Sequence, residues 1–190
     1  MGHTQTKELK KIPLGSGDIF VVEWDGKTIP EDGTIEVESN MIGRTKNGAT
    51  ITYSPEYYTA KSDDGKAKKS QIYGEEATFT YGNITWNGNT LAVLSSTARV
   101  SEKDGKRTVK IGGVSNFNGK KYLLRFLHTD PVDGDIRITV VGVNTDGWSA
   151  AFANNNETIL NPKFECEPID DDGTLIIYEE EIIEPSASGG

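Results

Sequence analysis

Histidine, cysteine and clustered carboxylates are the side chains of this sequence that could do chemistry. Only two histidines occur, His3 in a polar segment and His128 at the end of a predicted strand, and Cys166 is the single cysteine. A zinc site needs three or four such ligands, and a serine hydrolase would have to recruit one of the two histidines without any Gly-x-Ser-x-Gly elbow. The sequence therefore supports neither chemistry, and we interpret His128 as a strand-end residue that hydrogen-bonds to its turn.

An acidic run over residues 170–173, Asp-Asp-Asp-Gly, is the best candidate for a calcium loop. Placing Gly173 at the sixth position of such a loop puts Glu179 at the twelfth, as calcium binding requires. The first position then falls on Pro168, which has no side-chain oxygen, and the following residues have the pattern of a strand. The same test on Asp63-Asp64-Gly65 puts Gln71 at the last position. Both runs are therefore predicted to be acidic turns, and no cofactor is expected.

Two further features lack the context that reactivity needs. Gly15-Ser16-Gly17 precedes Asp18, whose charge would repel a phosphate, so this segment is interpreted as a turn. Alternation places Cys166 on the same strand face as Phe164, which favours a buried, unreactive thiol. A pair of carboxylates able to hydrolyse a glycoside stays open, since some of 29 acidic residues will lie close together by chance.

Composition and charge limit the class of protein. The chain has 190 residues, enough for one domain, and a formal charge of −9 that would repel a nucleic-acid backbone. No apolar run approaches the roughly 20 residues of a membrane span, and the first eleven residues are polar. We expect synthesis and folding in a cytosol, without a membrane partner.

The dominant pattern is short β-branched and aromatic runs separated by Gly, Asn and Asp, which is typical of an antiparallel β-sandwich or barrel. Leucines and small residues three apart predict one short flanking helix within residues 89–99. Turns are expected at Asp25-Gly26, Asp32-Gly33, Asn47-Gly48, Asp104-Gly105, Asn118-Gly119 and Asp133-Gly134. The predicted strands cover residues 18–24, 34–39, 49–53, 70–73, 77–85, 107–111, 121–128, 135–143, 148–153, 163–168 and 175–180.

The predicted organisation is a flexible N-terminal arm over residues 1–14, one β-sandwich domain over 15–181 and a flexible C-terminal tail over 182–190. Residues 54–69 form a long loop in which two tyrosines precede a run of mixed charge. Loops of this length in compact domains usually serve a partner or a site.

Several segments follow one another in a characteristic order along most of the chain. They are residues 17–20, 40–49 with 53–55, 75–79, 111–113, 119–122 with Phe126 and His128, 144–152 and 164–176. The closing segment 164–176 combines a core residue, a strand, an acidic turn and a final strand. This order resembles the major tail tube proteins of long-tailed bacteriophages and phage-tail-like particles, most of all in the closing segment, and contains no catalytic signature.

The resemblance implies a structural virion protein and not an enzyme. Its subunits would form hexameric rings stacked into a tube through which DNA passes without specific binding. Six copies of a −9 chain carry −54, and such an acidic lumen would let DNA slide. The implied location is the virion tail after synthesis in the host bacterial cytoplasm, and the implied partners are further copies and tape-measure, tail-terminator and distal tail proteins.

The resemblance also suggests that two hairpins of each subunit join edge to edge with those of neighbours. We expect one hairpin from residues 44–53 and 70–85, and another from 107–111 with 122–127 or 135–143. The loop over residues 54–69 would reach the next ring and order on contact. Its predicted inter-subunit contact residues are Tyr57, Tyr58, Lys61, Asp63, Asp64, Lys66, Lys68 and Lys69.

Other functions stay open beside this one. A different tail or connector protein, or the tube of a contractile particle, would share the same physics. A surface- or carbohydrate-binding β-sandwich could use Trp24, Trp86 and Trp148 as stacking faces, although their positions favour core packing. A small hydrolase is the remaining alternative and lacks any pairing of nucleophile and base.

Overall fold

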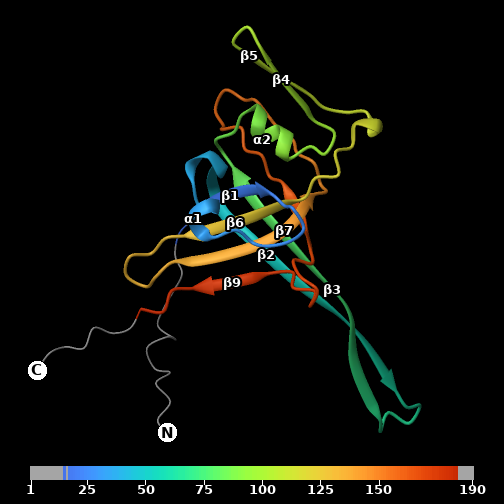
Figure 1. Cartoon of the computed structure of the whole chain (residues 1–190). Coiled ribbons are helices and arrows are strands. Elements are labelled where there is room, and N and C mark those ends of the chain that lie inside the picture. The colour runs from blue at the N-terminus through green and yellow to red at the C-terminus, as the bar shows by residue number, and fades with distance from the viewer. Residues whose placement is uncertain (1–14, 16, 184–190) are drawn as a thin grey trace, which may run out of the picture.

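A computed structural model describes Gly15 and residues 17–183 of the chain. The predicted flexible N-terminal arm over residues 1–14 and most of the predicted C-terminal tail, residues 184–190, lie outside the described residues. The described part is mainly β, as expected from the sequence, with two short α-helices (Figure 1). The strands are β1 (Asp18–Glu23), β2 (Met41–Lys61), β3 (Lys68–Asn83), β4 (Arg99–Lys103), β5 (Lys106–Lys110), β6 (Tyr122–His128), β7 (Ile136–Asn144), β8 (Lys163–Glu167) and β9 (Ile177–Glu180).

The main sheet closes on itself as a barrel. Its strands follow the order β6-β1-β2-β3-β8-β7-β9, and β6 also pairs with β7, so all strands except β9 form a ring. Every pairing is antiparallel. Strand β9 pairs with the first half of β7, while β8 pairs with its second half. Closure removes most of the exposed strand edges of the body.

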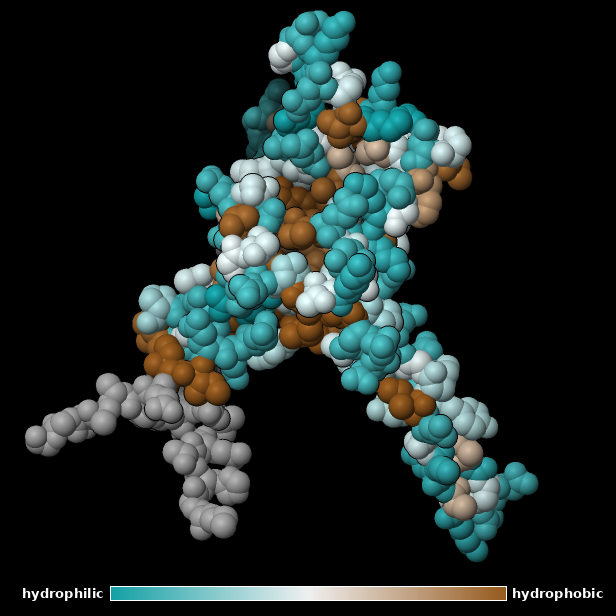
Figure 2. All heavy atoms as spheres, viewed as in Figure 1, coloured by the Kyte–Doolittle hydropathy of each residue, from teal (hydrophilic) through white to brown (hydrophobic). Residues whose placement is uncertain are grey.

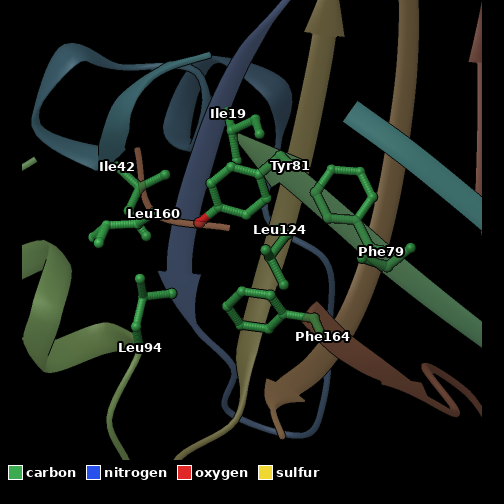
Figure 3. Packing of buried hydrophobic residues seen from close by; sticks show 9 residues of the cluster. Ile19, Ile42, Phe79, Tyr81, Leu94, Leu124, Leu160 and Phe164 are labelled. Carbon is green, nitrogen blue, oxygen red and sulfur yellow. The ribbon is translucent and has the colours of Figure 1, made fainter. Parts of the chain in front are cut away.

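Aromatic and aliphatic side chains fill the inside of the barrel. Figure 3 shows Phe79, Tyr81 and Phe164 gathered with aliphatic residues from β1, β2 and β6. The rings of Tyr81 and Phe164 stack with their centroids 6.3 Å apart, and Phe79 lies 5.8 Å from Tyr81. Each of these three side chains is at most 4% exposed. Their burial makes this cluster the principal hydrophobic core.

A second, smaller core lies on the outer face of the same strands. Phe20, Leu123 and Val141 belong to it, whereas their neighbours along the chain, Ile19, Leu124 and Val140, point into the barrel. Successive side chains of a strand alternate between faces, so consecutive buried residues mean that both faces are covered. Ile35 and Ile169 supply the covering layer. Part of the barrel wall is therefore packed on both sides, as in a sandwich.

The predicted strand over residues 34–39 is wrong. The chain there forms helix α1 (Asp32–Ile35) and the 3-10 turn η2 (Glu38–Asn40), so the predicted Asp32-Gly33 turn is the start of a helix. One helical turn brings Asp32 and Glu36 onto the same side, where both accept hydrogen bonds from Arg125. Two ionic contacts and the buried Ile35 outweigh the local preference for strand.

The predicted helix is confirmed as α2 (Gly88–Val93), but it is shorter than residues 89–99. The side chain of Asn87 accepts from the backbone N–H of Thr90, and the Thr90 hydroxyl accepts from the N–H of Asn87, which makes a capping box. Beyond this helix the chain enters β4, which was not predicted. Strand β5 pairs with β4 alone, so the predicted pairing of residues 107–111 with 122–127 or 135–143 is also wrong.

Two further expectations need correction. Residues 49–53, 70–73 and 77–83 belong to two long continuous strands, β2 and β3, and the predicted strand 77–85 ends two residues early, at Asn83. Asn47-Gly48 forms a bulge within β2 at positive φ. Residues 148–153 form no strand. Their polar groups bond elsewhere, with the Trp148 indole N–H donating to the Ser95 hydroxyl at 2.8 Å and Thr158 donating to the Ala151 carbonyl.

Candidate assembly surface

The most prominent surface feature is the outer part of the β2–β3 hairpin, residues 54–76, which we call the arm. It projects away from the barrel as a two-stranded ribbon (Figure 1). The predicted 16-residue loop over 54–69 is therefore wrong in extent: β2 continues to Lys61, β3 begins at Lys68, and only residues 62–67 turn. The hairpin prediction for residues 44–53 with 70–85 is confirmed by the pairing of β2 with β3.

Both outer edges of the arm lack a strand partner within the described chain. Strand β1 pairs with β2 only between Met41 and Arg44, and β8 pairs with β3 only between Thr78 and Thr80. Each edge strand presents a row of backbone N–H and C=O groups that another strand can pair with. The arm therefore offers two strand edges for association.

Tyr57 and Tyr58 lie on the arm and are 62% and 66% exposed. As consecutive strand residues they point to opposite faces of the ribbon, so the two cannot anchor in one pocket together. Tyr57 opposes Ile72, and Tyr58 opposes Gln71. Each face of the arm thus carries one of the two predicted tyrosine anchors.

The predicted charged contact residues gather at the tip of the arm and are all exposed. Lys61 lies directly opposite Lys68, and Lys69 opposes Ala60. Asp64 organises the turn, because its carboxylate accepts from the Ser62 hydroxyl and from the backbone N–H of Lys66. These bonds hold the pKa of Asp64 below its usual value. Asp63 and Lys66 complete the tip.

Several exposed residues in and beside the arm were not among the predicted contact residues. Tyr53 donates from its hydroxyl to the Glu75 carboxylate at 2.8 Å, and Ile72 and Tyr73 are 44% and 69% exposed. The register shifts between Glu56 and Tyr57, leaving Tyr73 as the extra residue of a bulge. Alternation continuing through residues 70–76 was the available signal for these positions.

A second hairpin, β4–β5, forms a separate two-stranded sheet at the end of the molecule opposite the arm (Figure 1). Asp104 and Gly105 turn the chain at φ 52° and 72°, as expected for an Asp-Gly turn. The sphere view shows a mostly hydrophilic surface on both hairpins (Figure 2). The molecule therefore has two projecting ribbons that point in different directions.

The groups considered for chemistry occupy structural positions. Cys166 packs against the barrel core, and burial raises the pKa of its thiol to about 11. Asp170 accepts from the backbone N–H of Thr174 in the predicted acidic turn, which lowers its pKa. His128 ends β6 and is 7% exposed. Residues 15 and 17–183 contain no group of three or more His, Cys, Asp or Glu placed to hold a metal ion.

The three tryptophans are partly buried and pack against the two cores, as the sequence favoured. The indole N–H of Trp86 donates to the Thr158 carbonyl at 3.1 Å, which fixes the ring against the body. None of the helices in the described part of the chain is long and apolar enough to cross a membrane.

Comparison with known proteins gives structural matches only. No family model and no curated protein matches the sequence. The tail of an empty gene transfer agent particle with C6 symmetry is similar over 85% of this chain and 95% of its own, at 10% identity and a TM-score of 0.43. A chain of the virion of a native gene transfer agent particle matches with the same coverage and identity, at a TM-score of 0.39.

Proposed function

We propose that this protein is a structural virion protein, the major tail tube subunit of a phage or phage-tail-like particle. In this proposal subunits form hexameric rings, and stacked rings enclose an acidic lumen for DNA during ejection. The observation that carries it is the arm, a long exposed ribbon with two open strand edges. The resemblance of the sequence to tail tube proteins supplies the specific form of the assembly.

A projecting two-stranded ribbon of this kind is not expected in a protein that remains monomeric. Two-stranded hairpins are marginally stable alone in water, and exposed edges invite pairing with other chains. The arm nevertheless keeps its tyrosines and Ile72 on the surface instead of folding back onto the barrel. Pairing with neighbouring copies would bury these side chains and satisfy the open edges. Self-assembly is thus the function that this geometry supports best.

The net negative charge of the chain favours passage of DNA through the ring over binding of DNA to its wall. With −9 per copy, a closed ring would present mainly repulsive potential to phosphates. The proposal includes an acidic lining of the lumen. It also includes contacts with partners such as tape-measure and tail-terminator proteins.

Replacing the arm tests the proposal. Residues 54–76 would be exchanged for Asn-Gly, which joins Tyr53 to its opposite residue Ala77 by a two-residue hairpin turn. We expect the barrel to fold, because almost all of the removed side chains are exposed, and we expect rings or tubes to disappear in sedimentation velocity.

Point variants give a matched control for this experiment. Tyr57→Ser with Tyr58→Ser should weaken assembly, whereas Tyr178→Ser removes a tyrosine that is 54% exposed on β9 and should leave it unchanged. If the variant without the arm assembles as well as the wild type, the role proposed for the arm is contradicted.

A further inference from the structure

The β4–β5 hairpin has one face that carries only cationic and neutral side chains. Alternation places Arg99, Lys103, Lys106 and Lys110 on that face together with Ser101 and Thr108. The opposite face carries two valines and the Arg107–Glu102 ion pair, at 2.6 Å. A Cβ added to Gly88 of α2 would lie 2.9 Å from side-chain atoms of Arg107 and Val109, so this second face packs on the body. The cationic face is therefore the outer one.

The cationic face is electrostatically unfavourable in a lone subunit. Arg99 lies opposite Lys110, and Lys103 lies opposite Lys106, so both charged pairs on this face of the hairpin are like-charge pairs. Directly opposed like charges destabilise a pair of strands. None of the four forms an ion pair with another described residue. An anionic partner would relieve this repulsion.

The base of the arm has the complementary character. Glu56 and Glu76 lie on one face of the ribbon, at diagonal positions of the β2–β3 register, and both are exposed. Residues 54–60 and 70–77 contain no lysine or arginine. The Glu56 carboxylate extends over Gly74, where an added Cβ would lie 2.8 Å from it. This acidic face of the arm has no cationic partner within the described chain.

We propose that the cationic face of β4–β5 docks on the acidic face of the arm in a second copy of this chain. The two ribbons project from opposite ends of the subunit, so the contact joins unlike surfaces and repeats from copy to copy (Figure 1). The inference rests on the proposed tube and names the charged pairing between successive subunits.

Reciprocal charge reversal tests this pairing. Lys103→Glu with Lys106→Glu reverses the hairpin, and Glu56→Lys with Glu76→Lys reverses the arm. Each reversal alone should raise the concentration needed for assembly in sedimentation velocity on the order of tenfold or more. The two reversals in one chain restore complementary charge and should return assembly close to that of the wild type. Assembly should also weaken as salt rises.

A net-charge control makes the result specific. The arm reversal combined with Lys27→Glu and Lys163→Glu has the same formal charge as the matched combination, but it leaves the hairpin cationic. The pairing is supported if the matched combination restores assembly and the net-charge control does not. Equal rescue by both, or rescue by neither, overturns it.

Other outcomes are equally decisive. A wild type that assembles while both reversals have no effect overturns the pairing and leaves the tube proposal intact. A wild type that never self-associates contradicts both. Binding of a 20-base-pair DNA duplex by the wild type, measured by fluorescence anisotropy and lost with the hairpin reversal, would assign the cationic face to nucleic acid instead.

Discussion

Tyr81 places a polar hydroxyl group inside the apolar core of the barrel. Its ring stacks on Phe164 inside the barrel, but its buried hydroxyl has no hydrogen-bond partner among the described residues. Burial raises the pKa of this hydroxyl. A buried polar group without a partner loses the hydrogen bonds that water provides when the chain is unfolded.

The substitution Tyr81→Phe should therefore keep or raise stability. It preserves the ring and removes only the hydroxyl, so we expect a free energy of unfolding equal to the wild type or up to about 2 kcal/mol higher. Urea denaturation followed by tryptophan fluorescence measures this change. Phe164→Ala is the comparison and should cost about 3–5 kcal/mol, because it leaves a cavity in the core. A clear loss of stability in Tyr81→Phe would mean that the hydroxyl is bonded.

Much of the residue-level picture could be predicted from alternation alone. Cys166 lies beside the core as expected, and consecutive apolar pairs such as Leu123-Leu124 fall in strands covered on both faces. The Tyr53–Glu75 contact could not be foreseen, because it depends on the register of β2 with β3, which the bulge at Tyr73 shifts by one residue.

Among the elements, α1 is held to the barrel by ion pairs and not only by apolar packing. Arg125, 2% exposed on β6, donates to Asp32 at 2.6 Å, to Glu36 at 2.9 Å and to the Thr139 hydroxyl at 2.8 Å. Arg137 on β7 donates to the same Glu36 carboxylate at 2.8 Å. The hydrogen bonds with Glu36 raise the pKa of Arg137. Glu36 thus joins two arginines beneath the helix.

Glu36→Gln should destabilise the protein by about 2–4 kcal/mol, because it leaves a buried arginine with less compensating charge. Thermal or urea unfolding measures the loss. Glu23→Gln is the matched control: Glu23 pairs with Lys120 at 2.6 Å, but both side chains are about half exposed, so its removal should cost at most about 1 kcal/mol. Equal effects of the two variants would show that the network under α1 contributes no more than a surface ion pair.

The elements that sequence reasoning misplaced are those fixed by distant contacts. Residues 34–39 have the alternating pattern of a strand, yet the arginines of β6 and β7 bind Glu36 and hold the start of this segment in a helical turn. The arm resembles a loop in sequence because its tip is polar and Pro55 lies near its base, but pairing of β2 with β3 keeps it extended. The mainly β fold, the helix α2 and the first hairpin could be predicted, since they depend on local pattern.

At the scale of the whole molecule, two ribbons extend from one barrel in opposite directions. In a monomer of this shape, strand edges and unpaired charges are exposed to water. A repeating assembly would cover them. The proposed stacking of rings uses both ribbons of every subunit, one as donor and one as acceptor. This arrangement grows in one direction, as a tube does.

The central claim is that the chain builds a hollow tube, and electron microscopy of the purified protein over a concentration series tests it most directly. Sedimentation of the same samples reports the mass of the particles. Our account predicts rings with six-fold symmetry at moderate concentration and stacked hollow tubes at higher concentration. A protein that remains monomeric at every concentration, or that forms only closed dimers, would contradict it.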